Sequence, residues 1–272
     1  MFGLTVPQIL GLSVIGAVVS AVGSIAGVII KDYFFSRSFE MWKQKVALRQ
    51  LYEKFRDPLL LSAQELASRI LEIVDEYPTV FLRTEVVATS PQRQIENSTD
   101  DPYFRRYKLV STLYRFCSFL GWLELFRQEI AFLHPGDNRQ SLKIDQCVAS
   151  IRSALADGHI NTADDWDNWR DTLVFREELR AIGEVMIETR GSARNVIGYG
   201  KFCELFDSTS PSETKQWAMV AMNFFLDLET TQRDFRLTRL QLLLIHLVEF
   251  LECVSTRPVQ PRLLNARERL RG

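Results

Sequence analysis

The chain has 272 residues, of which 46% are apolar and 25% are charged, and its formal net charge is −1. This composition suits a globular protein with a sizeable core. Because the net charge is close to zero, the overall charge does not indicate a strongly acidic or strongly basic partner. The four cysteines are scattered without a C-x-x-C pair or zinc-ligand spacing, so they predict reduced thiols in a core. Glycine and proline are sparse, which favours helices.

The N-terminal segment is uncharged over residues 1–30. Residues 9–30 form a continuous apolar run that is roughly 33 Å long as a helix, close to the hydrocarbon thickness of a bilayer. A secretory signal peptide would need a basic start and a shorter apolar core. A buried core helix is rarely apolar on every face for six turns. The sequence therefore predicts a transmembrane anchor over residues 1–31.

The flanking charges predict the orientation of this anchor. Between Lys31 and Arg56 the chain has seven Lys or Arg residues and three Asp or Glu residues. The positive-inside rule places this side in the cytoplasm. We therefore expect a single-pass protein of the inner (cytoplasmic) membrane, with its N-terminus outside and the bulk of the chain in the cytoplasm.

Small residues recur along one face of the apolar segment. Ser13, Gly16, Ser20, Gly23 and Gly27 are spaced by three and four residues, and the last two form a G-x-x-x-G motif. Such a face allows two helix backbones to approach closely in lipid. Glycine is also common in membrane helices that stay single. The spacing nevertheless predicts oligomerisation through Gly16, Ser20, Gly23 and Gly27.

The fold class predicted for the rest of the chain is all-α. Residues 32–56 are expected to form a stalk helix, because apolar residues continue at helical spacing. Asp57-Pro58 is typical of a helix start, so a new helix is expected from there to about residue 75, opening a helical cytoplasmic domain over 57–256. Residues 76–101 predict a loop, with a short strand over 79–87 as the alternative. Further helices are predicted over 102–133, 141–156, 172–189, 199–206, 211–226 and 230–255. The tail, residues 257–272, has five arginines and one glutamate, and is expected to be disordered.

Three stretches, Tyr52–Ile70, Ser111–Leu133 and Phe175–Phe202, occur in the order found in a family that they resemble. This is an uncharacterised bacterial family with an N-terminal membrane anchor and a helical cytoplasmic domain. The resemblance implies that the region folds as one unit. It implies no catalytic residue.

The most distinctive charge pattern lies within the predicted helix 172–189. Arg176, Arg180 and Glu184 recur at intervals of four, so they share one helix face, and Gly183 predicts a close approach to another helix. A ladder of salt bridges, solvated or between helices, accounts for these charges. The alternative is a ligand site for an anion, formed by the same three residues.

Other chemistry finds little support. The chain has no phosphate-binding glycine loop and no G-x-S-x-G motif. His246, Glu249 and Glu252 could face one side of a helix, but a bundle metal site needs a matching set from a neighbouring helix. We therefore expect no metal and no cofactor. The aromatic and basic residues of 103–115 fit a helix with a core face and an exposed flank, so no nucleic acid partner is expected.

Together these patterns predict a membrane-anchored helical module for interaction or signalling. Its expected partners are the bilayer, a second copy through the anchor, and an unknown protein or small ligand. A role in bacterial stress or defence fits this layout by analogy alone. The alternative is a membrane-tethered enzyme with an unrecognised active site.

Overall fold

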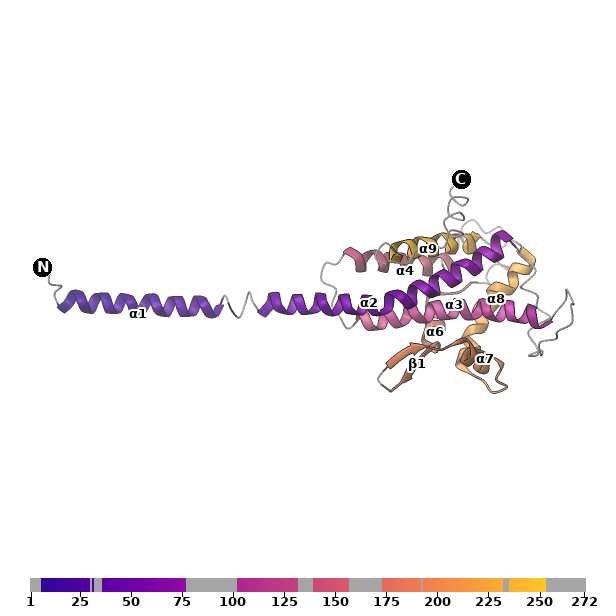
Figure 1. Cartoon of the computed structure of the whole chain (residues 1–272), viewed down its shortest axis with the longest axis horizontal. Coiled ribbons are helices and arrows are strands. Elements are labelled where there is room, and N and C mark those ends of the chain that lie inside the picture. The colour runs from indigo at the N-terminus through magenta and orange to yellow at the C-terminus, as the bar shows by residue number, and fades with distance from the viewer. Residues whose placement is uncertain are drawn as a thin grey trace. The chain divides into compact units, whose positions relative to one another are not determined.

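The computed structural model describes residues 6–29, 31, 36–76, 102–131, 139–156, 173–191, 193–231 and 235–252. The described elements, in chain order, are α1 (Val6–Ile29), α2 (Ser36–Leu71), the π-helical turn η2 (Glu72–Glu76), α3 (Pro102–Ala131), α4 (Arg139–Ala156), α6 (Arg176–Val185), β1 (Ile187–Arg190), β2 (Ala193–Val196), α7 (Tyr199–Asp207), α8 (Glu213–Thr231) and α9 (Phe235–Glu252). Helices dominate (Figure 1), which confirms the mostly helical fold. The predicted alternative strand 79–87 and the tail 257–272 lie outside the described residues.

The chain divides into two compact units, which are described separately. The first comprises Met1–Gln50 with Leu133–Gly136, and the second comprises Leu51–Phe132 with Asp137–Gly272. Helix α1 belongs to the first unit and carries no charged residue. Within the part of the chain that the structure describes, no helix is both long enough and apolar enough to cross a membrane. The predicted helix is thus confirmed at the N-terminus, whereas the anchor over residues 1–31 gains no support from the structure.

Helix α2 corrects the predicted boundary between the stalk and the next helix. Asp57 and Pro58 lie inside one continuous helix rather than at a helix start. A proline inside a helix removes one backbone hydrogen bond and costs about 3 kcal/mol. Its neighbours Phe55, Leu59 and Leu60 are at most 2% exposed. Since burying each such side chain contributes about 1.5–3 kcal/mol, tertiary packing outweighs the local signal.

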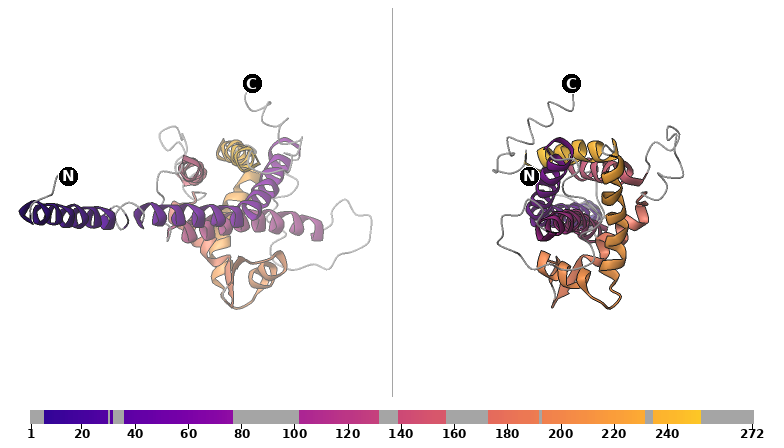
Figure 2. Two further views of the ribbon diagram at one scale, coloured as in Figure 1. Left: turned by 60° about the vertical axis from the view of Figure 1, so that its left-hand side comes forward. Right: turned by 90° about the vertical axis from the view of Figure 1, so that its right-hand side faces the viewer.

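The core of the second unit lies between helices that are distant in sequence. Helix α3 contacts α6, α7 and α8, and α4 packs along α9. The two views in Figure 2 show α4 and α9 side by side, as Figure 1 does. Within the core, the rings of Phe116 on α3 and Phe225 on α8 meet edge to face, with centroids 5.6 Å apart. The helices predicted over 102–133, 141–156, 199–206, 211–226 and 230–255 are confirmed, with ends displaced by a few residues.

Helix α6 approaches α3 closely at Gly183. A Cβ atom at this position would lie 2.7 Å from the carbonyl oxygen of Leu120 and 2.8 Å from the Cβ of Glu124. Both distances are shorter than van der Waals contact, so only glycine fits without movement of the α3 backbone. The close approach predicted from Gly183 is confirmed.

A β-hairpin replaces the end of the helix predicted over 172–189. Helix α6 ends at Val185, and β1 pairs antiparallel with β2, with Arg190 opposite Ala193. This register leaves a two-residue turn, and Gly191 has a φ of 62°. A positive φ at a two-residue hairpin turn favours glycine. The Gly-Ser pair between two short runs of polar and apolar residues is a hairpin signal in the sequence. The helical periodicity before it led instead to the prediction of a longer helix.

Replacing Gly183 with alanine is expected to destabilise the fold by about 1–3 kcal/mol, because the added methyl group overlaps the α3 backbone. Gly200, in the first turn of α7, is the matched control, since a Cβ atom there meets nothing within 4 Å. Gly200→Ala should leave the free energy of unfolding unchanged or slightly higher. Urea titration of the full chain in mild detergent measures both variants. Equal stability of the two would show that the crossing tolerates a side chain.

Candidate functional site

The predicted site residues Arg176, Arg180 and Glu184 lie on α6 and are all exposed. The opposite face of α6 buries Leu179, Ile182 and Gly183, so the helix is amphipathic in the predicted sense. The three charged residues therefore form a surface ladder.

One member of this ladder reaches a neighbouring helix. Arg176 donates a hydrogen bond of 3.0 Å from Nη2 to Ser153 Oγ on α4. Arg180 acts electrostatically on Arg152, and Glu184 acts on Arg127. The ladder thus borders a second group of charges, which the sequence analysis did not single out.

That second group surrounds Glu124, a glutamate of α3 that is 1% exposed. Its carboxylate accepts a 2.8 Å hydrogen bond from Arg127 Nε and another of 2.8 Å from Gln128 Nε2. Arg152 of α4 adds an ion pair at 3.6 Å. Glu124 lies between Leu123 and Leu125, both buried. A charged residue within an apolar run was the signal that could have identified it.

Electrostatics keep Glu124 ionised despite its burial. Burial alone would raise the pKa of this carboxyl, but the hydrogen bonds from Arg127 and Gln128 and the charges of Arg127 and Arg152 outweigh it. The pKa therefore falls below its ordinary value. The pKa of Arg127 is raised, chiefly by its hydrogen bonds to Glu124. A carboxylate satisfied in this way holds helices together and is poorly suited to accept protons in catalysis.

The hairpin is tied to the same part of α3. Arg194 of β2 donates a hydrogen bond to Gln128 and forms an ion pair of 3.6 Å with Glu129. The charges around Glu124 therefore connect α3 with α4 and, through Gln128, with β2. Their arrangement favours the interpretation as an inter-helix salt-bridge network over an open ligand site.

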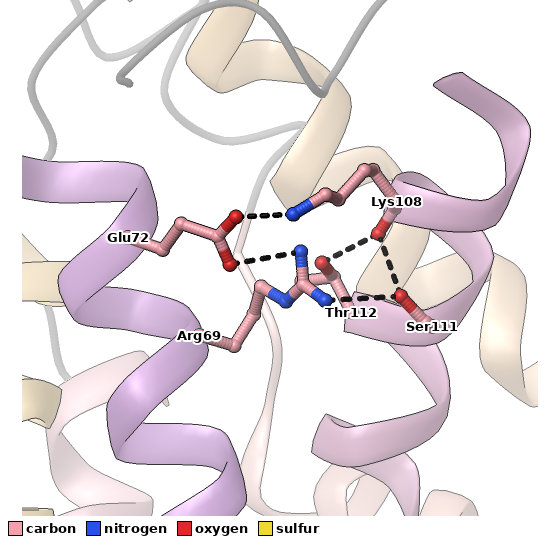
Figure 3. A network of polar contacts seen from close by, with 5 residues as sticks. All are labelled: Arg69, Glu72, Lys108, Ser111 and Thr112. Carbon is pink, nitrogen blue, oxygen red and sulfur yellow. Dashed lines mark hydrogen bonds and ion pairs between the residues drawn. The ribbon is translucent and has the colours of Figure 1, made fainter. Parts of the chain in front are cut away.

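A different network joins the end of α2 to α3 (Figure 3). Arg69 places Nη1 3.1 Å from Glu72 Oε2, and its Nη2 donates to Ser111 Oγ at 3.3 Å. Lys108 forms an ion pair with the other oxygen of Glu72. Ser111 and Thr112 both donate to the Lys108 carbonyl, at 3.2 and 2.7 Å. One carboxylate is thus shared between two cations.

Arg69 is unusual within this network because it is only 3% exposed. Among the described residues, its Nε and Nη1 have no hydrogen-bond partner, although Nη1 is within ion-pair distance of Glu72. Burial and the charge of Arg115 lower the pKa of Arg69, while Glu72, Tyr107 and Tyr199 act in the opposite direction. Glu72 opens η2, and π-helical turns occur frequently at functional sites. This network and the Glu124 network differ in one respect: the buried charge of Glu124 is fully satisfied and that of Arg69 is not.

The three described thiols of Cys117, Cys147 and Cys203 are free; Cys117 is in the core as predicted, whereas Cys147 and Cys203 are only partly buried. Cys253 lies outside the described residues. Burial raises the pKa of each thiol, to about 11 for Cys147. These groups are therefore protonated at neutral pH, whereas a nucleophilic cysteine needs a lowered pKa.

The remaining predicted positions are placed as follows. Gly16, Ser20, Gly23 and Gly27 are exposed on α1, and a Cβ atom at any of the three glycines would meet nothing within 4 Å. On α9, His246 is exposed, whereas Glu252 is buried. In the part of the chain that the structure describes, no group of three His, Cys, Asp or Glu side chains could hold a metal ion.

The pH dependence of stability should reveal the Glu124 network. Because the folded-state pKa of Glu124 is depressed, its contribution is complete above the unfolded pKa of about 4.3 and is lost as the pH falls through the folded value. Glu124→Gln should therefore cost about 3 kcal/mol at pH 7 and progressively less below about pH 4.5. Chemical denaturation of the full chain at several pH values measures this difference.

The matched control is Glu204→Gln, which removes an exposed pair with Lys201. Exposed pairs contribute at most about 1 kcal/mol, so this variant should follow the wild type at every pH. A Glu124→Gln effect that did not change between pH 7 and pH 3 would contradict an ionised Glu124.

Comparison of this chain with protein-family models, with curated proteins and with solved structures finds no match in any of the three. The family resemblance stated from the three sequence stretches therefore stays an expectation. Function has to be inferred from the residues themselves.

Proposed function

We propose that the protein is a membrane-anchored helical module for interaction or signalling, with α1 as its anchor. One observation carries the proposal. Helix α1 has 24 residues without a charged side chain, and its valines and isoleucine at positions 18, 19, 22, 25 and 28 are 56–65% exposed. A helix of this length spans roughly 36 Å, enough for the hydrocarbon layer. In water such an apolar surface would be unfavourable, and lipid would remove that cost.

The start of α2, in the same unit, supports the proposal independently. Phe39, Met41 and Trp42 are 52%, 48% and 59% exposed, and the rings of Phe39 and Trp42 stack with centroids 5.9 Å apart. Lys43 Nζ lies 4.4 Å from the Phe39 ring centre. Aromatic rings interleaved with basic side chains are typical of the membrane–water interface. We infer that this segment lies at the cytoplasmic interface.

The proposed location is the inner (cytoplasmic) membrane, with the N-terminus outside. The basic excess between Lys31 and Arg56 supports this orientation. The second unit would then lie in the cytoplasm, where reduced cysteines are the rule, and the free thiols of Cys117, Cys147 and Cys203 agree with that environment.

A module fits the chemistry better than the alternative, a membrane-tethered enzyme. The shifted thiol pKa values favour the unreactive protonated form, and the shifted pKa of Glu124 reflects ion pairing between helices. In this proposal the second unit serves as a scaffold whose surfaces are available to a partner. By analogy, bacterial stress or defence is a setting in which such anchored modules act.

Membrane anchoring predicts that the full chain stays in the membrane pellet after an alkaline carbonate wash. Replacing Val18 and Val22 with aspartate should release it, because a charged residue at the centre of a span costs about 2.5–3.5 kcal/mol. The control, Val18→Leu with Val22→Leu, should remain in the pellet. A fluorescent protein fused after Arg56 should fluoresce, and alkaline phosphatase fused there should be inactive. A wild-type chain found in the supernatant would refute the anchor.

Self-association is the second proposed role of α1. Gly23→Ile with Gly27→Ile should weaken dimerisation of the α1 segment in a membrane reporter assay. Each lost close contact costs on the order of 1 kcal/mol, because packing drives association in lipid. Val18→Ile with Val22→Ile adds bulk on the other side of the helix and should have little effect. Equal signals from both double variants would show that the glycines do not form the interface.

A further inference from the structure

Glu252, at the C-terminal end of α9, is a buried carboxyl group with an incomplete set of partners. It is 6% exposed. Its Oε1 accepts a hydrogen bond of 2.5 Å from Nε2 of Gln64 on α2. Its Oε2 is also buried, and among the described residues it has no hydrogen-bond partner. The single partner of this carboxyl group is therefore an uncharged amide.

The comparison with Glu124, the other buried glutamate of the second unit, shows what Glu252 lacks. The carboxylate of Glu124 has two arginines and an amide donor as partners. A carboxylate away from water is costly unless a cation and hydrogen-bond donors compensate its charge. A protonated carboxyl group carries no charge and still has an oxygen that accepts a hydrogen bond. The surroundings of Glu252 therefore favour its neutral form.

The groups that face Glu252 agree with this conclusion. Gln64, which contacts it from α2, is uncharged. On α9 itself the charged group that acts on Glu252 is Glu249, which makes interactions of its own. Burial raises the pKa of Glu252 and the negative charge of Glu249 raises it further, whereas the hydrogen bond from Gln64 offsets these effects only in part.

We propose that Glu252 and Gln64 form a pH-sensitive contact, which protonation of Glu252 strengthens and ionisation weakens. The two residues are 188 positions apart, so their contact joins the beginning of the second unit to the end of its described part. Ionisation adds an uncompensated charge at Oε2, and that charge is better solvated when the end of α9 separates from α2. Docking of α9 on α2 is thus a regulatory element of the helical unit, and it does not depend on α1 entering a membrane.

The expected pH dependence has a definite sign. Because the folded-state pKa of Glu252 is raised, the contact is strongest below the unfolded pKa of about 4.3 and weakens as the pH rises through the folded value. The sign is opposite to that of Glu124, whose pKa is depressed. The stability of the whole chain combines both effects, so the test needs a local measurement at the end of α9.

Hydrogen exchange followed by mass spectrometry provides this measurement, since amide exchange reports local opening. The full chain in mild detergent is measured between about pH 4.5 and pH 7.5, and the rates are corrected for intrinsic exchange. The opening constant of the last two turns of α9 should rise with pH, by at most about tenfold per pH unit, the limit for one proton. In Glu252→Gln, which keeps the shape of the side chain without its charge, opening should stay at the low-pH level. In Gln64→Leu, opening should be greater at every pH.

Matched controls remove exposed titratable groups. His246→Gln on α9 and Glu204→Gln on α7 should keep the pH dependence of the wild type. If opening in the wild type does not rise with pH, or if the rise persists in Glu252→Gln, the proposal is wrong. Should Glu252→Gln fail to fold, Glu249→Gln decides, because loss of its charge should make the rise smaller and an unchanged rise would contradict the proposal.

Discussion

The contact of α6 with α3 at Gly183 is the constraint on which the helical unit depends. Because position 183 has no side chain, α6 lies against the carbonyl of Leu120 and beside Glu124. The hairpin that follows then reaches α3 as well, where a Cβ atom at Gly121 would lie 3.2 Å from the methyl carbons of Val196 on β2. The same crossing turns the charged face of α6 to solvent. One glycine thus positions a helix, a hairpin and a row of surface charges.

Two buried charges in the second unit, Glu124 and Arg69, have different sets of partners. Glu124 has an arginine on its own helix, a second on α4, and an amide donor, so its charge is stabilised. Arg69 shares its carboxylate with Lys108 and lies in the field of Arg115. Since an unsatisfied buried charge costs more than a hydrogen bond contributes, the first arrangement strengthens the fold, whereas the second leaves part of a buried charge unsatisfied.

The two compact units have surfaces of opposite character. In the second unit the large apolar side chains are mostly buried, among them Phe116, Phe202 and Phe225. In the first unit valines, Phe39 and Trp42 remain exposed. The hydrophobic effect disfavours such exposure in water, and this is the observation on which the proposed anchor rests.

The sequence by itself determined the helical class, the positions of most helices and the close approach at Gly183, because periodicity and the absence of a side chain are local properties. It also indicated the exposed ladder of Arg176, Arg180 and Glu184. Only the tertiary structure decided that α2 continues through Pro58, since the packing of Phe55, Leu59 and Leu60 outweighs the local preference of proline. Likewise, the Arg69 and Glu124 networks require partners from α3 and α4 that lie far along the chain. Long-range contacts of this kind leave no periodic pattern, because the free energy of a buried charge depends on which groups the fold brings beside it.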